Sequence, residues 1–198
     1  NAEIIPVSVI ICARNESDQL ILNLPKILEQ NYAEFEVIVV NHQSIDNSKE
    51  ILEEFSKQYR NLKIVELQHN KHLRSGKKLP LTIGIKAAKY EHLLFTDADC
   101  MPSSSMWIHH MSSKFNSKNI ILGYGPLSTL PGFLNKLIRY DTAWIGINYL
   151  SMALHNRPYM GVGRNMAYTK DTFFTNNGFK SHYSIASGDD DLFIQEAT

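Results

Sequence analysis

The stretch HLLFTDAD, residues 92–99, decides the fold because it joins a buried strand to two carboxylates. Its first part, His92 to Thr96, is short and apolar, as expected of a strand buried in a parallel sheet. Asp97 and Asp99 follow at a spacing of two, so both side chains point to the same side. Their oxygen atoms form a hard site that suits Mg²⁺ or Mn²⁺. A helix cap or a solvated turn is the alternative for this pair, and its surroundings decide between them.

Strands and helices alternate regularly before this stretch. Three further strands are predicted from β-branched and apolar runs, at residues 7–12, 35–40 and 62–67. Apolar residues at helical spacing predict helices between the strands, at residues 20–28, 46–59 and 77–89. Pro25 marks either a kink or the first turn of the first helix, and Asp46 can cap the second. Single helices between strands predict right-handed crossovers, and therefore an α/β fold with a parallel sheet.

The pattern changes after residue 99, where we expect a smaller second half. Helices are predicted at residues 103–115 and 133–154, and a last one opens at the acidic run 188–191. Strands are predicted at residues 119–124 and 161–167, the second from small residues that let a backbone approach a ligand closely. The sequence shows no repeat, low-complexity tract or linker, so residues 1–198 are expected to form one domain.

Composition and charge exclude several classes of protein. The 198 residues include 20 Lys and Arg against 20 Asp and Glu, and 43% are hydrophobic, which is typical of a folded globular chain. The zero formal charge argues against nucleic acid as the main partner. Cys12 and Cys100 are too few for a disulfide framework, and free thiols favour a reducing compartment.

We expect a soluble piece on the cytoplasmic side of the cell. No run reaches the ~18 apolar residues of a membrane span, and residues 1–5 do not resemble a signal peptide. Both ends look cut, since residue 1 opens almost directly onto a strand and the last helical pattern stops without a terminating signal. The expectation is a C-terminally truncated part of a longer protein, in which any membrane anchor lies outside this chain.

Polar residues gather directly after three of the predicted strands. They are Ala13–Glu16 after the first, Asn41–Ser44 after the second and Asp97–Asp99 after the fourth. Because ligands of open parallel sheets bind at the carboxyl ends of the strands, the three groups should share one rim. Caps and turns are the alternative for each group alone, and the coincidence of all three favours a binding site.

A second acidic cluster, Gly188 to Asp191, opens the last predicted helix. The alternative is a favourable placement of acids in the first turn of a helix. Three adjacent carboxylates repel one another, however, and crowding can raise the pKa of one of them into the range of a general base. A carboxylate with such a pKa can remove the proton of an attacking hydroxyl group.

The basic turn from Arg74 to Lys78 precedes a predicted helix but lacks the residue order of a P-loop. Its positive side chains either lie near a diphosphate or form a solvated turn. The eight histidines show no paired metal-ligand spacing, and only His182 is considered as a ligand. Trp107 and Trp144 are expected in the core.

Six segments, in this order, resemble the inverting family 2 glycosyltransferases of the GT-A fold. They are VSVIICARNES (7–17), EVIVVNHQSIDNS (36–48), GKKLPLTIGIKAA (76–88), LLFTDADC (93–100), GVGRNMAYTKDTFFTNNGF (161–179) and SGDDDLF (187–193). The resemblance implies a Rossmann-like, mostly parallel sheet flanked by helices. A nucleotide-sugar-binding half would cover residues 1–100, and a smaller acceptor-side half residues 101–198. The implied reaction moves a sugar from a nucleotide-diphosphate donor to an acceptor hydroxyl with inversion.

The resemblance also assigns roles to individual residues. Contacts to the nucleotide sugar fall on Cys12, Arg14, Glu16, His42, Arg74, Lys77 and Asp97. Asp99, together with Asp97, would hold Mg²⁺ or Mn²⁺. Asp190 would be the catalytic base, with Asp189 orienting it or exchanging roles with it.

Two departures from the family pattern concern the substrate. Asn41 and His42 replace an acidic pair that usually contacts the nucleotide base, so UDP is a default rather than a deduction. The downstream Gln-x-x-Arg-Trp element is absent because the chain ends first. The sequence fixes neither the sugar nor the acceptor, which would be a saccharide or a lipid-linked molecule. Many relatives continue into membrane helices, which would place the domain at the cytosolic face of a membrane.

Two other functions compete with sugar transfer. A phosphatase of the haloacid dehalogenase type would use Asp97 as its nucleophile, but the nucleophile strand of that class usually comes early, and here three strands precede it. A non-catalytic nucleotide-sugar-binding domain is the other alternative, motivated by Asn41, His42 and the missing downstream element.

Overall fold

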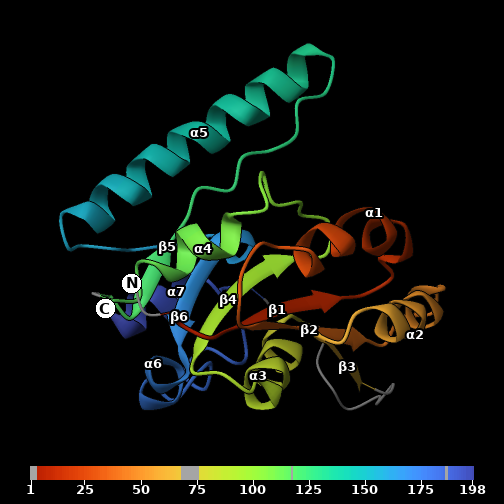
Figure 1. Cartoon of the computed structure of the whole chain (residues 1–198). Coiled ribbons are helices and arrows are strands. Elements are labelled where there is room, and N and C mark those ends of the chain that lie inside the picture. Colours follow the sequence, from red (N-terminus) through yellow and green to blue (C-terminus); the bar gives the residue numbers. More distant parts are fainter. Residues whose placement is uncertain (1–3, 68–75, 117, 186) are drawn as a thin grey trace.

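The fold is a six-stranded sheet with helices on both faces, seen in a computed structural model that describes residues 4–67, 76–116, 118–185 and 187–198 (Figure 1). The strands in these ranges are β1 (Val7–Ala13), β2 (Phe35–His42), β3 (Leu62–Leu67), β4 (His92–Asp97), β5 (Ile120–Leu122) and β6 (Met166–Thr169). Their order in the sheet is β3-β2-β1-β4-β6-β5. Strands β1 to β4 pair in parallel, whereas β6 is antiparallel to both β4 and β5. The predicted, mostly parallel sheet is confirmed.

Six of the seven helices in the described ranges form one layer on each face of the sheet, and α5 lies apart from it. They are α1 (Ser17–Leu28), α2 (Ser48–Gln58), α3 (Lys78–Ala87), α4 (Trp107–Ser112), α5 (Phe133–Leu154), α6 (Lys170–Thr175) and α7 (Asp191–Ala197). One core cluster joins α1, α2 and α4 to the sheet, and a second joins α3, α6 and α7 to the opposite face. The alternation within β1 produces this division, because Val9 and Ile11 enter the first cluster and Ile10 the second. In Figure 1, α1 and α4 lie above the arrows of the sheet, and α3 and α6 lie below them.

The carboxylate of Asp46 joins the first two crossover helices at their starts. Its Oδ2 accepts a hydrogen bond from the backbone N–H of Ser17 at 3.0 Å, and its Oδ1 accepts one from Ser48 at 3.1 Å. Partial burial acts to raise the pKa of Asp46, but these hydrogen bonds outweigh it and hold the pKa below its usual range. Asp46 therefore caps both helices rather than only the predicted one, and it ties together the two loops that follow β1 and β2.

Two local predictions were wrong. The strand expected at residues 161–167 is confined to β6, because Gly163–Asn165 forms a turn of 3₁₀ helix before it. Trp144 is 57% exposed rather than part of the core. Of the two options for Pro25, the first turn is excluded, because Pro25 lies inside α1, which begins at Ser17 and runs on to Leu28, and a kink at this position stays a prediction.

Helix α5 lies apart from the sheet and keeps a large apolar surface exposed (Figure 1). It contacts the body through Gly146, which packs against the ring of Tyr124, and through Tyr149, whose hydroxyl donates to the carbonyl of Gly123 at 2.8 Å. Its opposite side carries an apolar stripe, Phe133, Leu137, Tyr140, Trp144, Ile147 and Leu154. Among the described residues, α5 and the other helices are too short or too polar to cross a bilayer.

Candidate functional site

A cavity of about 580 Å³ opens at the carboxyl ends of β1, β2 and β4. The nine predicted site residues within the described ranges all line it, namely Cys12, Arg14, Glu16, His42, Lys77, Asp97, Asp99, Asp189 and Asp190. The tenth, Arg74, lies outside the described residues. The two acidic clusters, which are about 90 residues apart in the sequence, therefore face one shared space.

The first acidic cluster has a donor set that fits a divalent cation. One carboxylate oxygen of Asp97, one of Asp99 and the Sγ of Cys100 lie within 4.8 Å of one another. Two carboxylates supply the oxygen ligands that Mg²⁺ and Mn²⁺ prefer, and open positions would remain for water or phosphate. In the part of the chain that the structure describes, this is the only group of three potential ligands. His182 is not part of it, because its ring pairs with Ser181 and Glu196.

Lys77 lies between the two acidic clusters. Its Nζ forms an ion pair with Oδ1 of Asp97 at 2.7 Å. Burial acts to lower the pKa of Lys77, but the charge of Asp97 and, to a smaller extent, that of Asp189 outweigh it and raise the pKa. The ammonium therefore stays protonated, and it supplies a fixed positive charge next to the predicted metal ligands.

The three acids of the second cluster have different surroundings. Both oxygens of Asp190 accept backbone hydrogen bonds, from Gly163 at 3.0 Å and from Asp191 at 2.9 Å, so this carboxylate caps α7 and fixes a loop. Asp189 faces the cavity, and burial followed by the charge of Asp190 raises its pKa. Asp191 does not line the cavity, and one of its oxygens is buried without a hydrogen-bond partner in the described structure.

Asn41 and His42, at the end of β2, differ in whether a ligand in the cavity can reach them. His42 lines the cavity, and burial together with the charge of Arg14 lowers its pKa, so its ring is neutral at pH 7. Asn41 is buried, and its amide group is already paired: the nitrogen donates to both oxygens of Glu66, and the oxygen accepts from the hydroxyl of Ser44. Of the two residues that replace the family's acidic pair, only His42 is available to a nucleotide.

The sequence analysis missed Gly163 and Arg164 as cavity-lining residues. The backbone N–H of Gly163 holds Asp190, and a Cβ on this glycine would lie 3.6 Å from a carboxylate oxygen of that residue. Arg164 donates from Nε and Nη2 to the carbonyl of Gly125, which fixes the wall beside the glycine. The run of small residues at 161–167 was the sequence signal for this part of the cavity wall, but it was interpreted as a strand.

The fold and the cavity together define a class of protein. It is an α/β domain in which carboxylates suited to bind a divalent cation lie at the carboxyl ends of the parallel strands. The sequence profile of glycosyl transferase family 2 matches residues 8–171, so the chain belongs to this family.

Two curated relatives match part of the chain. It is 38% identical over 93 residues, 47% of its length, to a poly-beta-1,6-N-acetyl-D-glucosamine synthase of Staphylococcus epidermidis. It is 31% identical over 120 residues, 59% of its length, to a poly(ribitol-phosphate) beta-glucosyltransferase of Bacillus spizizenii. These matches cover 21% and 18% of the relatives, so the chain spans about a fifth of their length.

Two solved structures share the fold over nearly the whole chain. Residues 1–349 of S. aureus TarS in complex with UDP-GlcNAc superpose with a TM-score of 0.68 at 20% identity, covering 98% of this chain and 53% of that fragment. The mannosyltransferase PcManGT of Pyrobaculum calidifontis, in complex with GDP-Man and Mn²⁺, gives a TM-score of 0.71 at 18% identity over 96% of this chain and 50% of the other. The fold is therefore of the GT-A type, as the sequence predicted.

Asp191 is expected to make stability depend on pH. Burial and the charge of Asp190 raise its pKa from 3.8 to about 6, although a hydrogen bond from Gly161 opposes them. The folded protein therefore holds this proton more tightly, and stability should fall as the pH rises from 3.8 to about 6. Asp191→Asn should raise the Tm at pH 7.5 by several degrees, since about 1 kcal/mol corresponds to roughly 2–4 °C in a domain of this size.

Thermal unfolding of the wild type and the variant between pH 4 and 8 measures this effect. Asp18→Asn is the matched control, because Asp18 is also an acid in the first turn of a helix but is exposed. The higher Tm of Asp191→Asn relative to the wild type should disappear near pH 4. An equal gain at pH 4 and pH 7.5, or none at either, would contradict the assignment.

Proposed function

We propose that this domain transfers a sugar from a nucleotide-diphosphate donor to an acceptor hydroxyl, with inversion at the anomeric carbon. The observation that carries the proposal is the shared cavity, which is lined by Asp97 and Asp99 of the first acidic cluster, by Asp189 of the second, and by Lys77 between them. This arrangement separates the group that leaves from the group that attacks, as a single in-line displacement requires. Family membership supports the reaction class, and the alternative phosphatase reaction has no such support.

The end of the cavity at Asp97, Asp99 and Lys77 has the groups that would bind a diphosphate. Asp97 and Asp99 would hold Mg²⁺ or Mn²⁺, and the bound ion would neutralise charge on the leaving diphosphate. Lys77 can donate from its protonated Nζ to a phosphate oxygen. Arg14 and His42 line the end of the same cavity toward β2, where the nucleotide base would bind. TarS was solved with UDP-GlcNAc and PcManGT with GDP-Man, so we propose UDP as the default donor and GDP as the competing one.

Asp189 is better suited than Asp190 to be the base. Both oxygens of Asp190 already accept backbone hydrogen bonds, which hold this carboxylate in place. Asp189 faces the cavity with a raised pKa, as expected of a group that takes a proton. We therefore propose that the two exchange the roles first assigned to them. Asp189 accepts the proton of the acceptor hydroxyl as its oxygen attacks the anomeric carbon, and Asp190 anchors the loop.

The acceptor and the cellular setting are proposed by analogy. The two curated relatives are named for polymers, poly-beta-1,6-N-acetyl-D-glucosamine and poly(ribitol-phosphate), which favours a saccharide or polyol-phosphate acceptor here, free or lipid-linked. We propose that the domain works at the cytoplasmic side, with contact to a membrane only through segments outside this chain. The non-catalytic alternative loses one of its three motives, because Asn41 is bound to Glu66 and Ser44 and does not line the cavity.

Nucleotide binding should depend on the metal ligands. Isothermal titration of UDP and GDP in the presence of Mn²⁺ should give saturable binding, and Asp99→Ala should weaken it by about 10-fold or more because a ligand of the ion is lost. Glu34→Ala is the control and should bind like the wild type, because Glu34 is an exposed acid just before the start of β2, at the end of the strand opposite to the cavity. The donor site is wrong if neither nucleotide binds the wild type, or if Asp99→Ala binds equally well.

The two candidate bases should be separable by kinetics. Asp189→Asn should lower kcat by about 10²–10⁴-fold, the usual contribution of general base catalysis, with little change in donor affinity. Asp190→Asn keeps an acceptor oxygen for Gly163 and should lose less. In the wild type, kcat should rise with pH through a pKa above the usual carboxyl range, because the base must be deprotonated. A larger loss for Asp190→Asn would restore the first assignment.

A further inference from the structure

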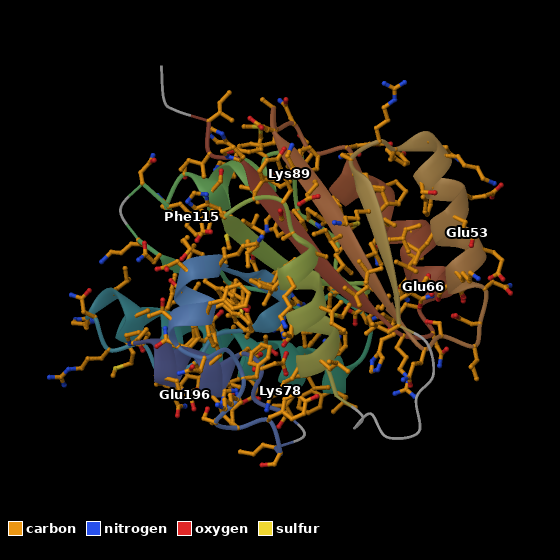
Figure 2. The ribbon with its side chains drawn as sticks, turned by 90° about the horizontal axis from the view of Figure 1, so that it is seen from below. Glu53, Glu66, Lys78, Lys89, Phe115 and Glu196 are labelled. Carbon is orange, nitrogen blue, oxygen red and sulfur yellow. The ribbon has the colours of Figure 1, made fainter. Side chains whose placement is uncertain are left out.

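Two consecutive lysines at the start of α3 point in opposite directions. Lys77 lines the donor cavity, whereas the side chain of Lys78 is buried, with only 4% exposed, and does not line it. The Nζ of Lys78 donates to three backbone carbonyls, those of His182 at 2.7 Å, Ile185 at 2.9 Å and Ser187 at 2.8 Å. In Figure 2, Lys78 lies where α3 meets the C-terminal part of the chain, on the same side as Glu196.

The three contacts account for the whole hydrogen-bonding capacity of the ammonium group. A lysine has three N–H donors, and each of them meets one carbonyl oxygen. A buried charge is costly unless it is fully paired in this way, so the segment must fold around Nζ in one arrangement. Replacing the ammonium with an apolar group would leave three carbonyls without this partner.

The contacted segment leads directly to the proposed base. Ser187 is followed by Gly188, whose φ of +86° makes the turn into Asp189. In the described structure, the residues between Phe179 and Asp190 form turns and bends but no helix or strand. Few backbone hydrogen bonds hold the described part of this segment, so the three Lys78 contacts are a large addition to those that Ser181 and His182 make with Glu196.

We propose that Lys78 is a positioning residue, which holds the segment before Gly188 so that the Asp189 carboxylate faces the donor cavity. The inference rests on the proposed function, in which Asp189 is the base. Because Lys78 begins the same helix end from which Lys77 reaches Asp97, one rigid element sets both sides of the cavity. Lys78 itself contacts neither the donor nor the acceptor.

The test compares Lys78→Met with the matched control Lys86→Met in the whole protein. Both remove one charge from α3, but Lys86 is exposed. Lys78→Met should lower kcat by about 10²-fold, the usual effect of a small misplacement of a catalytic group. The Kd for the nucleotide with Mn²⁺ should stay within about twofold of the wild type. Amide hydrogen exchange should accelerate in peptides that contain Ile185 and Asp189, but not in those from β1 and β4.

A second variant guards against loss of the fold. Lys78→Gln keeps two N–H donors without the charge, and it should give a smaller loss of kcat with the same unchanged nucleotide affinity. The proposal is overturned if kcat is unchanged in Lys78→Met, if nucleotide affinity falls in parallel with kcat, or if exchange accelerates throughout the sheet. It is also overturned if neither variant folds, since Lys78 would then support the whole domain.

Failure of this inference can be told apart from failure of the proposed function. Hydrogen exchange and nucleotide affinity do not require a turnover, so they report on the Lys78 contacts even if no transfer is observed. If Lys78→Met lowers kcat while Asp189→Asn does not, the base assignment fails and Lys78 does not act through Asp189.

Discussion

The register between β1 and its two parallel neighbours is the constraint on which the cavity depends. Cys12 of β1 lies opposite Asp97 of β4, and Ala13 lies opposite Asn41 of β2. The three strands therefore end at one level, and the loops that follow them open on the same side. A shift of one residue between β1 and β4 would turn Asp97 to the other face of the sheet and exchange the two core clusters. The buried valines and isoleucines that determine the register of the strands therefore also determine where Asp97 lies.

Charge balance is the second condition for the site. Four acids share the cavity, namely Asp97, Asp99, Asp189 and Asp190. Without nearby positive charge, repulsion between their carboxylates would push the walls of the cavity apart. Lys77 supplies one positive charge between the clusters, and backbone N–H groups hold Asp190. A divalent cation and a diphosphate would add charges of opposite sign on the side of Asp97. Burial, followed by the charge of Asp190, raises the pKa of Asp189, so the crowding of acids contributes to the property for which Asp189 is proposed as the base.

The sequence predicted the sheet and nine cavity residues because strong local signals mark them. Strands buried on both faces are continuous apolar runs, and polar residues just after them stand out, as Asp97 does after β4. Contacts between distant segments leave no such signal. Nothing near Lys78 in the sequence indicates that its ammonium meets carbonyls more than 100 residues away. The roles of Asp189 and Asp190 likewise depend on Gly163, which lies in a segment that was interpreted as a strand. The exposure of Trp144 was missed because α5 has apolar residues on more than one side, and only contacts identify the packed one.

Anomalous diffraction at the manganese edge, from crystals of the protein grown with UDP and Mn²⁺, tests the central claim most directly. The account predicts one strong peak between the carboxylates of Asp97 and Asp99, with the diphosphate beside it and the Asp189 carboxylate across the same cavity. A peak elsewhere in the molecule, or a nucleotide bound away from these acids, would contradict it.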